Sequence, residues 1–205
     1  MKGCMLEELK KEPMTSILIL INLMVFVLVE ATGSSQDTMH MVKCGAVYIP
    51  YILERGEYYR IFTCMFLHFG MEHLANNMLV LFVLGQRLEP IVGKFKFLVI
   101  YILGGMGGSL VSLAADLRHQ DFVVSAGASG AVFAVMGAMI YVLLRGRGRV
   151  ADLSARQILI MAVFSVYLGF AAGGVDNAAH LGGMACGFAL AVFLYHPRKI
   201  RNVEP

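Results

Sequence analysis

Long apolar runs, separated by short polar or charged segments, make up most of this chain. A helix needs about 20 residues to cross a bilayer, and each run reaches or approaches that length. The six runs cover residues 14–32, 74–88 with an extension from 66, 95–115, 126–144, 157–173 and 177–195. This pattern predicts an all-α, polytopic membrane protein with six transmembrane helices.

The stretch between the first two runs, residues 31–71, does not have the pattern of a plain span. It mixes aromatic residues with charges, as in Tyr48-Ile49-Pro50-Tyr51 followed by Glu54-Arg55-Gly56-Glu57. Such a mixture is typical of the boundary between membrane and water. We therefore expect a structured interfacial loop between the first and second helices.

The composition agrees with a membrane location and gives no sign of a nucleic-acid or metal site. Hydrophobic residues make up 58% of the chain and charged residues 15%, against roughly 25% charged residues in an ordinary soluble domain. The net charge of +3 is small and local, so it indicates no nucleic-acid partner. The four cysteines form neither a CxxC pair nor a metal-ligand spacing, so they indicate no metal site and are expected to be packing residues.

The distribution of lysine and arginine predicts the orientation in the membrane. The basic segments are the two tails, the 87–96 turn and the 145–156 loop, which places both termini in the cytoplasm. We expect a single membrane domain at residues 14–196 between short cytoplasmic tails at 1–13 and 197–205. Short tails and basic inner loops favour a multi-pass protein of a prokaryotic plasma membrane.

Several polar residues lie near the outer ends of the even-numbered spans, where they are costly unless they serve function or packing. His73 and Asn77 are four residues apart and so share one helical face of the second span. Ser129 lies near the start of the fourth span and His180 near the start of the sixth. Because these spans start from the same side, we expect the four side chains to lie at one depth.

These residue types fit nucleophilic catalysis. A serine hydroxyl needs a base within hydrogen-bond reach, and His180 is the only histidine in the last three spans. The Asn77 amide, the His73 imidazole and the Ser129 backbone N–H could donate to an oxyanion. The nearest acid is Asp176, which stands just before the sixth span and is expected to be a helix N-cap. The pattern therefore favours a Ser–His dyad over a triad.

Other interpretations of the same residues remain open at this stage. Gly127-Ala128-Ser129-Gly130 is also typical of close helix packing in membranes, and the histidines and Asn77 could be structural. A small transporter would call for acidic pairs at midplane or inverted repeats, and the sequence has neither. A lipid hydrolase that uses the same dyad is not excluded.

Three motifs, in the right order and on the right spans, resemble those of the rhomboid intramembrane serine proteases. The family's HxxxN, GxSG and AHxxGxxxG motifs correspond here to His73 and Asn77, to Gly127, Ser129 and Gly130, and to Ala179, His180, Gly183 and Gly187. Tyr59-Arg60 resembles the family's Trp-Arg pair, with tyrosine in place of tryptophan. The resemblance extends from about residue 14 to 195 and matches the family's compact six-helix form.

The resemblance implies a role for each matching residue. Ser129 would be the nucleophile and His180 the general base. His73, Asn77 and Gly127 would support the oxyanion, and Phe133 would stack on the histidine. Gly183 and Gly187 would let the sixth span pack tightly against the fourth, while Arg60 would anchor the half-submerged loop at 45–60. The fifth span and the 170–177 turn would form a lateral gate and a cap.

The function implied by the resemblance is that of an intramembrane serine endopeptidase. Its substrates would be transmembrane segments of single-pass or polytopic membrane proteins, cut at a site that opens toward the outer side. Membrane lipids would surround it, and no cofactor, metal or nucleic acid would take part. The alternative is a proteolytically inactive rhomboid-like module that binds membrane proteins.

Overall fold

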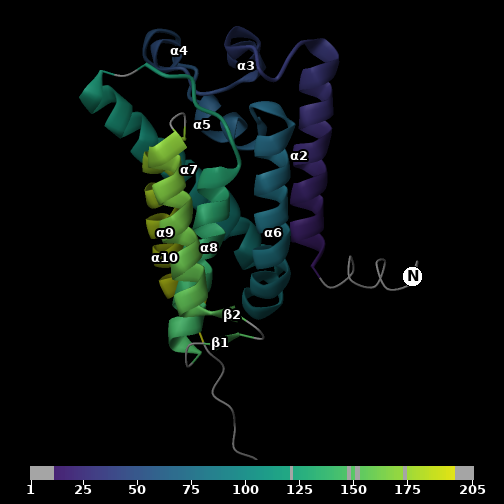
Figure 1. Ribbon diagram of the computed structural model, residues 1–205, viewed down its shortest axis with the longest axis vertical. Coiled ribbons are helices and arrows are strands. Elements are labelled where there is room, and N and C mark those ends of the chain that lie inside the picture. Colours follow the sequence, from purple (N-terminus) through teal and green to yellow (C-terminus); the bar gives the residue numbers. More distant parts are fainter. Residues whose placement is uncertain (1–11, 121, 147–148, 151–152, 173–174, 197–205) are drawn as a thin grey trace, which may run out of the picture.

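The computed structural model describes residues 12–120, 122–146, 149–150, 153–172 and 175–196. Within these ranges, six long helices run lengthwise through the molecule (Figure 1). They are α2 (Pro13–Thr32), α6 (Gly70–Val92), α7 (Lys94–His119), α8 (Ser129–Arg145), α9 (Ala155–Ala172) and α10 (Asn177–Leu194). Their positions agree with the six predicted runs. The described part of the chain is essentially all-helical.

Three of these helices, α2, α7 and α10, are both long and apolar enough to cross a membrane. In the described ranges, α8 and the part of α9 from Ala155 to Tyr167 are apolar but shorter. Large apolar side chains also point outward, such as Phe193 with 77% of its surface exposed. These features indicate an integral membrane protein, while the count of six crossings stays a prediction.

The start of α8 differs from the prediction. The apolar run begins at Ala126, but the helix begins at Ser129, after a coil that descends toward the middle of the molecule (Figure 1). We call residues 125–128 the pre-α8 segment. Ser125 and Val47 exchange two backbone hydrogen bonds, and the Gly127 N–H donates to the carbonyl of Cys64 at 3.0 Å. These partners outside the segment hold its backbone away from a helix, which apolarity alone could not reveal.

The end of α6 also differs from the prediction, which placed it within residues 85–90. The helix continues through Pro90 to Val92, and Gly93, with a φ of +89°, is its C-cap. Proline has no N–H and so removes one helical hydrogen bond. This loss is tolerated because Pro90 lies in the last turn of the helix. The buried Glu89 carboxylate accepts hydrogen bonds from the Met14 N–H and from both the N–H and the hydroxyl of Thr15. Glu89 thus satisfies the start of α2, where helical N–H groups lack partners.

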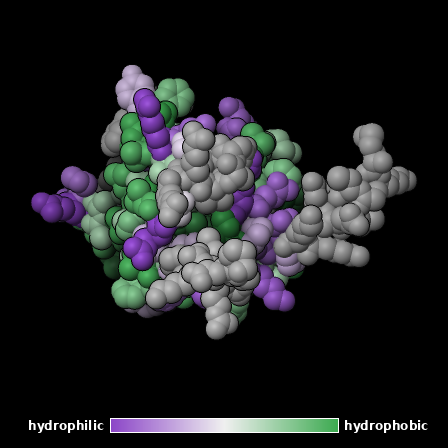
Figure 2. All heavy atoms as spheres, turned by 90° about the horizontal axis from the view of Figure 1, so that it is seen from below, coloured by the Kyte–Doolittle hydropathy of each residue, from purple (hydrophilic) through white to green (hydrophobic). Residues whose placement is uncertain are grey.

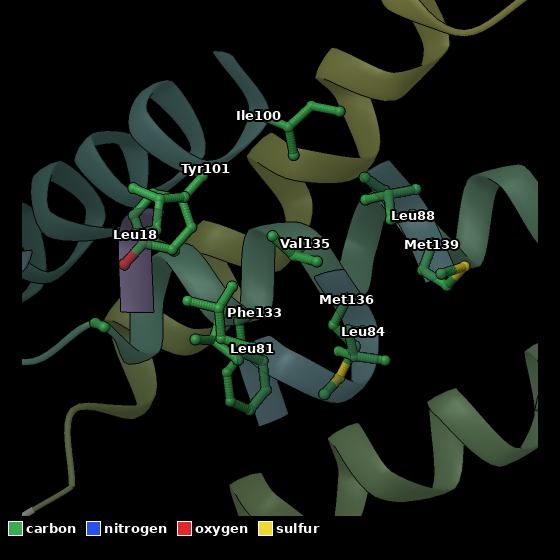
Figure 3. Close-up of a cluster of buried hydrophobic side chains, with 14 of the residues drawn as sticks. Leu18, Leu81, Leu84, Leu88, Ile100, Tyr101, Phe133, Val135, Met136 and Met139 are labelled. Carbon is green, nitrogen blue, oxygen red and sulfur yellow. The ribbon is translucent and has the colours of Figure 1, made fainter. Parts of the chain in front are cut away.

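The core lies where α6, α7 and α8 meet (Figure 3). Helix α8 is central, since it packs against α6, α7, α9 and α10. Fully buried side chains fill the space between the three helices: Leu81, Leu84, Leu88, Ile100, Tyr101, Val135, Met136 and Met139. This packing gives α8, and with it Ser129, a fixed position in the bundle.

The predicted interfacial loop is structured and lies at one end of the molecule (Figure 1). It contains α3 (Thr38–Cys44), α4 (Ile49–Arg55), α5 (Arg60–Thr63) and the 3₁₀ turn η1 (Cys64–Phe66). Arg60 is buried in it and donates to the carbonyls of Val42 and Ala46 at 2.6 and 2.8 Å. The same guanidinium forms an ion pair with Glu57. Because these partners come from different parts of the loop, Arg60 ties the loop together.

The opposite end carries a feature that the sequence did not predict. Two short antiparallel strands, β1 (Arg149–Val150) and β2 (Leu153–Ser154), lie in the basic loop between α8 and α9 (Figure 1). Seen from this end, hydrophilic side chains project at several points between hydrophobic ones (Figure 2). The strands are too short to produce a recognisable alternation in the sequence.

Candidate active site

His180 lies in the first turn of α10, with 7% of its surface exposed. Its ring stacks on Phe133 of α8, with centroids 4.2 Å apart and planes inclined by 7°. Phe133 follows Ser129 by four residues, so both lie on one face of α8. The structure therefore places the predicted base against the same helix that carries the predicted nucleophile.

Helices α8 and α10 approach each other closely beside these two residues. A Cβ atom at Gly183 would overlap the carbonyl oxygen of Gly130, and one at Gly187 would overlap that of Ala134. Both glycines therefore lie where the resemblance implies close packing. Only a residue without a side chain lets the backbones meet at this distance.

The side chains of His73 and Ser129 both lie close to Gly127. A Cβ atom on Gly127 would lie 2.7 Å from Cε1 of His73 and 3.6 Å from the hydroxyl oxygen of Ser129. Gly127 also has a φ of +150°, which side-chain-bearing residues rarely adopt. A glycine is thus needed here both for the backbone conformation and for the close approach of the His73 imidazole to this backbone.

Asn77 occupies the same side of α6 as His73 and is buried, while its neighbour Asn76 is exposed. Its side-chain amide donates to the His73 carbonyl at 3.1 Å. The structure thus brings His73, Ser129 and Phe133 with His180 into one region. The hydrogen bond of Asn77, in contrast, stays within its own helix.

His68 belongs to this region, although the sequence favoured only a structural role for it, holding the loop to the top of the second span. It is buried, and its Nε2 accepts the N–H of Ala128, next to Ser129, at 3.4 Å. Its ring meets that of His73 edge-on, with centroids 5.2 Å apart. Burial lowers the pKa of His68 to about 3, which keeps the imidazole neutral and able to accept. Its only sequence signal is its place just before the HxxxN motif.

Asp176 is the helix N-cap that the sequence predicted. Its carboxylate accepts the Ala179 N–H at 2.8 Å, and α10 begins at the next residue. Within the described residues, no hydrogen bond reaches the buried Nδ1 of His180. The arrangement thus resembles a dyad more than a triad, because a triad acid would bind that nitrogen.

Chemically, the region brings the Ser129 hydroxyl together with imidazole and amide side chains. Among the described residues, no group of three or more histidine, cysteine, aspartate or glutamate side chains could hold a metal ion. The Ser129 N–H starts α8, and the first N–H groups of a helix lack intrahelical partners. Such an N–H can stabilise a developing negative charge on a substrate oxygen.

Comparison with known proteins adds independent information. A family model described as "Rhomboid domain" matches residues 55–197. Rhomboid protease GluP of Bacillus subtilis (strain 168) is 35% identical over 188 residues, which cover 92% of this chain and 36% of that protein. RHOMBOID-like protein 1 of Arabidopsis thaliana is 37% identical over 166 residues, covering 79% of this chain and 41% of that protein.

A relative of more similar length is the putative rhomboid protease YdcA of Bacillus subtilis (strain 168). It is 31% identical over 147 residues, which cover 72% of both chains. In contrast, this chain spans between about a third and a half of the first three curated relatives it matches, at 36%, 41% and 50% of their lengths. The family model and the relatives confirm the resemblance, and the chain belongs to the rhomboid family.

Proposed function

We propose that this chain is an intramembrane serine endopeptidase that cuts transmembrane segments of other membrane proteins. The observation that carries the proposal is the stack of His180 on Phe133, on the helix that begins with Ser129. His73 beside the Ser129 hydroxyl adds a donor at the same place. The names of the relatives GluP and YdcA, both containing "rhomboid protease", support the same activity.

In the proposed reaction, Ser129 attacks the carbonyl carbon of the scissile peptide bond while His180 takes the hydroxyl proton. The imidazolium then gives this proton to the leaving amine, and water completes hydrolysis of the acyl-enzyme. The Ser129 N–H, His73 and Asn77 are the candidate donors to the oxyanion. Each lost oxyanion donor costs roughly 100- to 1,000-fold in kcat in well-studied serine proteases. No cofactor takes part.

Substrate access is proposed to be lateral, past α9. This helix packs mainly against α8 and less against α10. Of its described side chains, Ile158 and Ala162 are buried, while Phe164 and Tyr167 are more than half exposed. In lipid, helices are held together by packing and hydrogen bonds rather than by the hydrophobic effect, so a helix with few packed side chains can separate from the bundle at small cost. The substrate helix would have to unwind locally to offer its carbonyl.

The proposed setting is a multi-pass protein with six crossings and both termini in the cytoplasm. The site would then open toward the outer side, and the membrane would be the plasma membrane of a prokaryote. The basic loops at the β1–β2 end support this orientation, because lysine and arginine favour the cytoplasmic side.

A cleavage assay in liposomes tests the proposal. Purified protein is mixed with a model transmembrane substrate whose helix is weakened by glycine near the middle. We expect wild-type cleavage and none by Ser129→Ala or His180→Ala. Wild-type protein that folds and binds the substrate without cutting it would instead support an inactive binding module. Hydrolysis of a fluorogenic lipid ester in place of the peptide would support a lipid hydrolase.

A further inference from the structure

The Asp176 carboxylate connects three segments that are far apart in the sequence. One oxygen accepts the Ala179 N–H of α10 at 2.8 Å. The other accepts two serine hydroxyls, from Ser112 of α7 at 2.5 Å and from Ser125 of the pre-α8 segment at 2.7 Å. An ordinary N-cap needs only the first of these bonds. The two serine bonds therefore require a further explanation.

The two ends of this connection lead directly to the proposed dyad. Ser125 precedes Ser129 by four residues, and Asp176 precedes His180 by four residues. The backbone carbonyl of Asp176 also accepts the His180 N–H at 3.1 Å. Through these bonds, the carboxylate joins the segment that leads to the nucleophile with the turn that carries the base.

The pre-α8 segment needs such an anchor because it is irregular up to Ala128, whose carbonyl accepts the first helical hydrogen bond of α8, from the Val132 N–H. On the other side it is held by Val47, Cys64 and His68, all in the loop before α6. Asp176 is the described partner that links the segment to α10 through a side chain. Hydrogen bonds to a carboxylate are about twice as strong as neutral ones, so the link is a firm one.

We propose that Asp176 is a positioning residue that holds the pre-α8 segment and the start of α10 in one register, so that Ser129 and His180 meet. The proposal rests on the proposed peptidase function. Asp176 is not a triad member here, because the described contacts of its two oxygens are with Ala179, Ser112 and Ser125 rather than with the His180 ring. Its effect is geometric: a misplacement of about 1 Å can cost on the order of 100-fold in rate.

Two substitutions at Asp176 separate capping from cross-linking. Serine can still cap α10, but it lacks the second oxygen, Oδ2, that accepts the hydroxyls of Ser112 and Ser125. Asparagine keeps one oxygen for Ala179, and its NH₂ group can donate to both serine hydroxyls. Asp37→Ser is the matched control, because Asp37 caps α3 through the His40 N–H in the same manner.

The primary measurement is the second-order rate of Ser129 labelling by a fluorophosphonate probe, together with kcat and KM for a model transmembrane substrate. Unfolding midpoints in detergent show that each variant is folded at the assay temperature. We expect Asp176→Ser to lower the labelling rate and kcat by about tenfold or more, with KM within about twofold. For Asp176→Asn, the labelling rate and kcat should stay within about threefold of the wild-type values. For Asp37→Ser, both should equal the wild-type values.

A second variant removes only the link to the pre-α8 segment. Ser125→Ala leaves the cap intact and should lower the labelling rate by about threefold or more. Combined with Asp176→Ser, it should add little, because both changes break the same bond. If Asp176→Ser does not fold, Ser125→Ala alone decides the question.

The results distinguish the positioning role from the proposed function. Wild-type protein that never reacts with the probe would overturn both. If the wild type reacts and Asp176→Ser or Ser125→Ala reacts equally fast, the positioning role alone is overturned. The same holds if either variant has a changed unfolding midpoint but an unchanged labelling rate. Fully additive effects of the two substitutions would also contradict it.

Discussion

At the scale of single residues, the orientation of His180 depends on an aromatic neighbour rather than on an acid. The imidazole lies flat on Phe133, and within the described residues its Nδ1 has no hydrogen-bond partner. In a triad, an aspartate would bind that nitrogen and fix the ring. Here the stack on Phe133 has to orient the His180 ring, so a substitution of Phe133 should lower the rate of cleavage.

We predict that Phe133→Ala lowers kcat for a transmembrane substrate by about two- to tenfold, since stacked aromatic pairs contribute about 0.5–1.5 kcal/mol beyond area burial. Phe133→Tyr keeps the ring and should retain most of the activity. Steady-state kinetics in liposomes measure both. Equal activity of Phe133→Ala and wild type would contradict the orienting role of the stack.

A pH prediction concerns Glu57 in the interfacial loop. The hydrogen bond from Arg60 lowers the pKa of Glu57. A lowered pKa means that the pair stabilises the loop above the unfolded pKa of about 4.3, and that this stability disappears as pH falls through the lower folded pKa. We therefore expect Glu57→Gln to have a lower unfolding midpoint than wild type at pH 6–7. At a pH acidic enough to protonate Glu57, the two midpoints should be equal.

The control for this prediction is Glu54→Gln, at a nearby exposed glutamate of α4. It should leave the midpoint unchanged across the same pH series. A constant difference between wild type and Glu57→Gln down to the most acidic pH would show that the charge of Glu57 does not stabilise the loop.

At the scale of elements, the contact between α8 and α10 positions the site. Gly187 faces the carbonyl of Ala134, with no room for a Cβ atom. We predict that Gly187→Ala destabilises the protein by about 1–3 kcal/mol or more, because overpacking forces the helices apart. Ala185→Val, on an exposed face of the same helix, is the matched control.

Unfolding in mixed micelles with increasing denaturing detergent measures both variants. The control should stay within about 0.5 kcal/mol of wild type. A stable Gly187→Ala protein, with unchanged cleavage activity, would show that the two backbones can separate without cost.

The elements also show what the sequence could and could not predict. Hydrophobic runs located all six long helices, because an apolar run of this length has few alternatives in a membrane. The start of α8 was wrong by three residues, because the partners of Ser125 and Gly127 lie far away in the sequence. The contact of His68 with Ala128 was missed for the same reason, whereas the β1–β2 pair was missed because its strands are too short to show an alternation.

At the scale of the whole molecule, the main expectation is the orientation in the membrane. Met39 lies on the exposed side of α3, and Arg156 is exposed near β2 at the other end of the molecule. In a variant with all four native cysteines replaced by alanine, we predict that a membrane-impermeant maleimide labels Met39→Cys from outside. Arg156→Cys should react only after the membrane is permeabilised.

This labelling is done on spheroplasts of a bacterial expression host and is read by gel shift. The Met39→Cys protein in permeabilised cells gives the full signal for comparison. Labelling of Arg156→Cys in intact spheroplasts would contradict the predicted orientation and, with it, a site that opens toward the outer side.

The measurement that tests the central claim most directly is the identification of the residue modified by a fluorophosphonate probe in the purified, folded protein. Mass spectrometry of the labelled peptide should find the adduct on Ser129 alone, and His180→Ala should abolish labelling while leaving the fold intact. An adduct on another serine, or full labelling of His180→Ala, would contradict the account of Ser129 and His180 as a catalytic dyad.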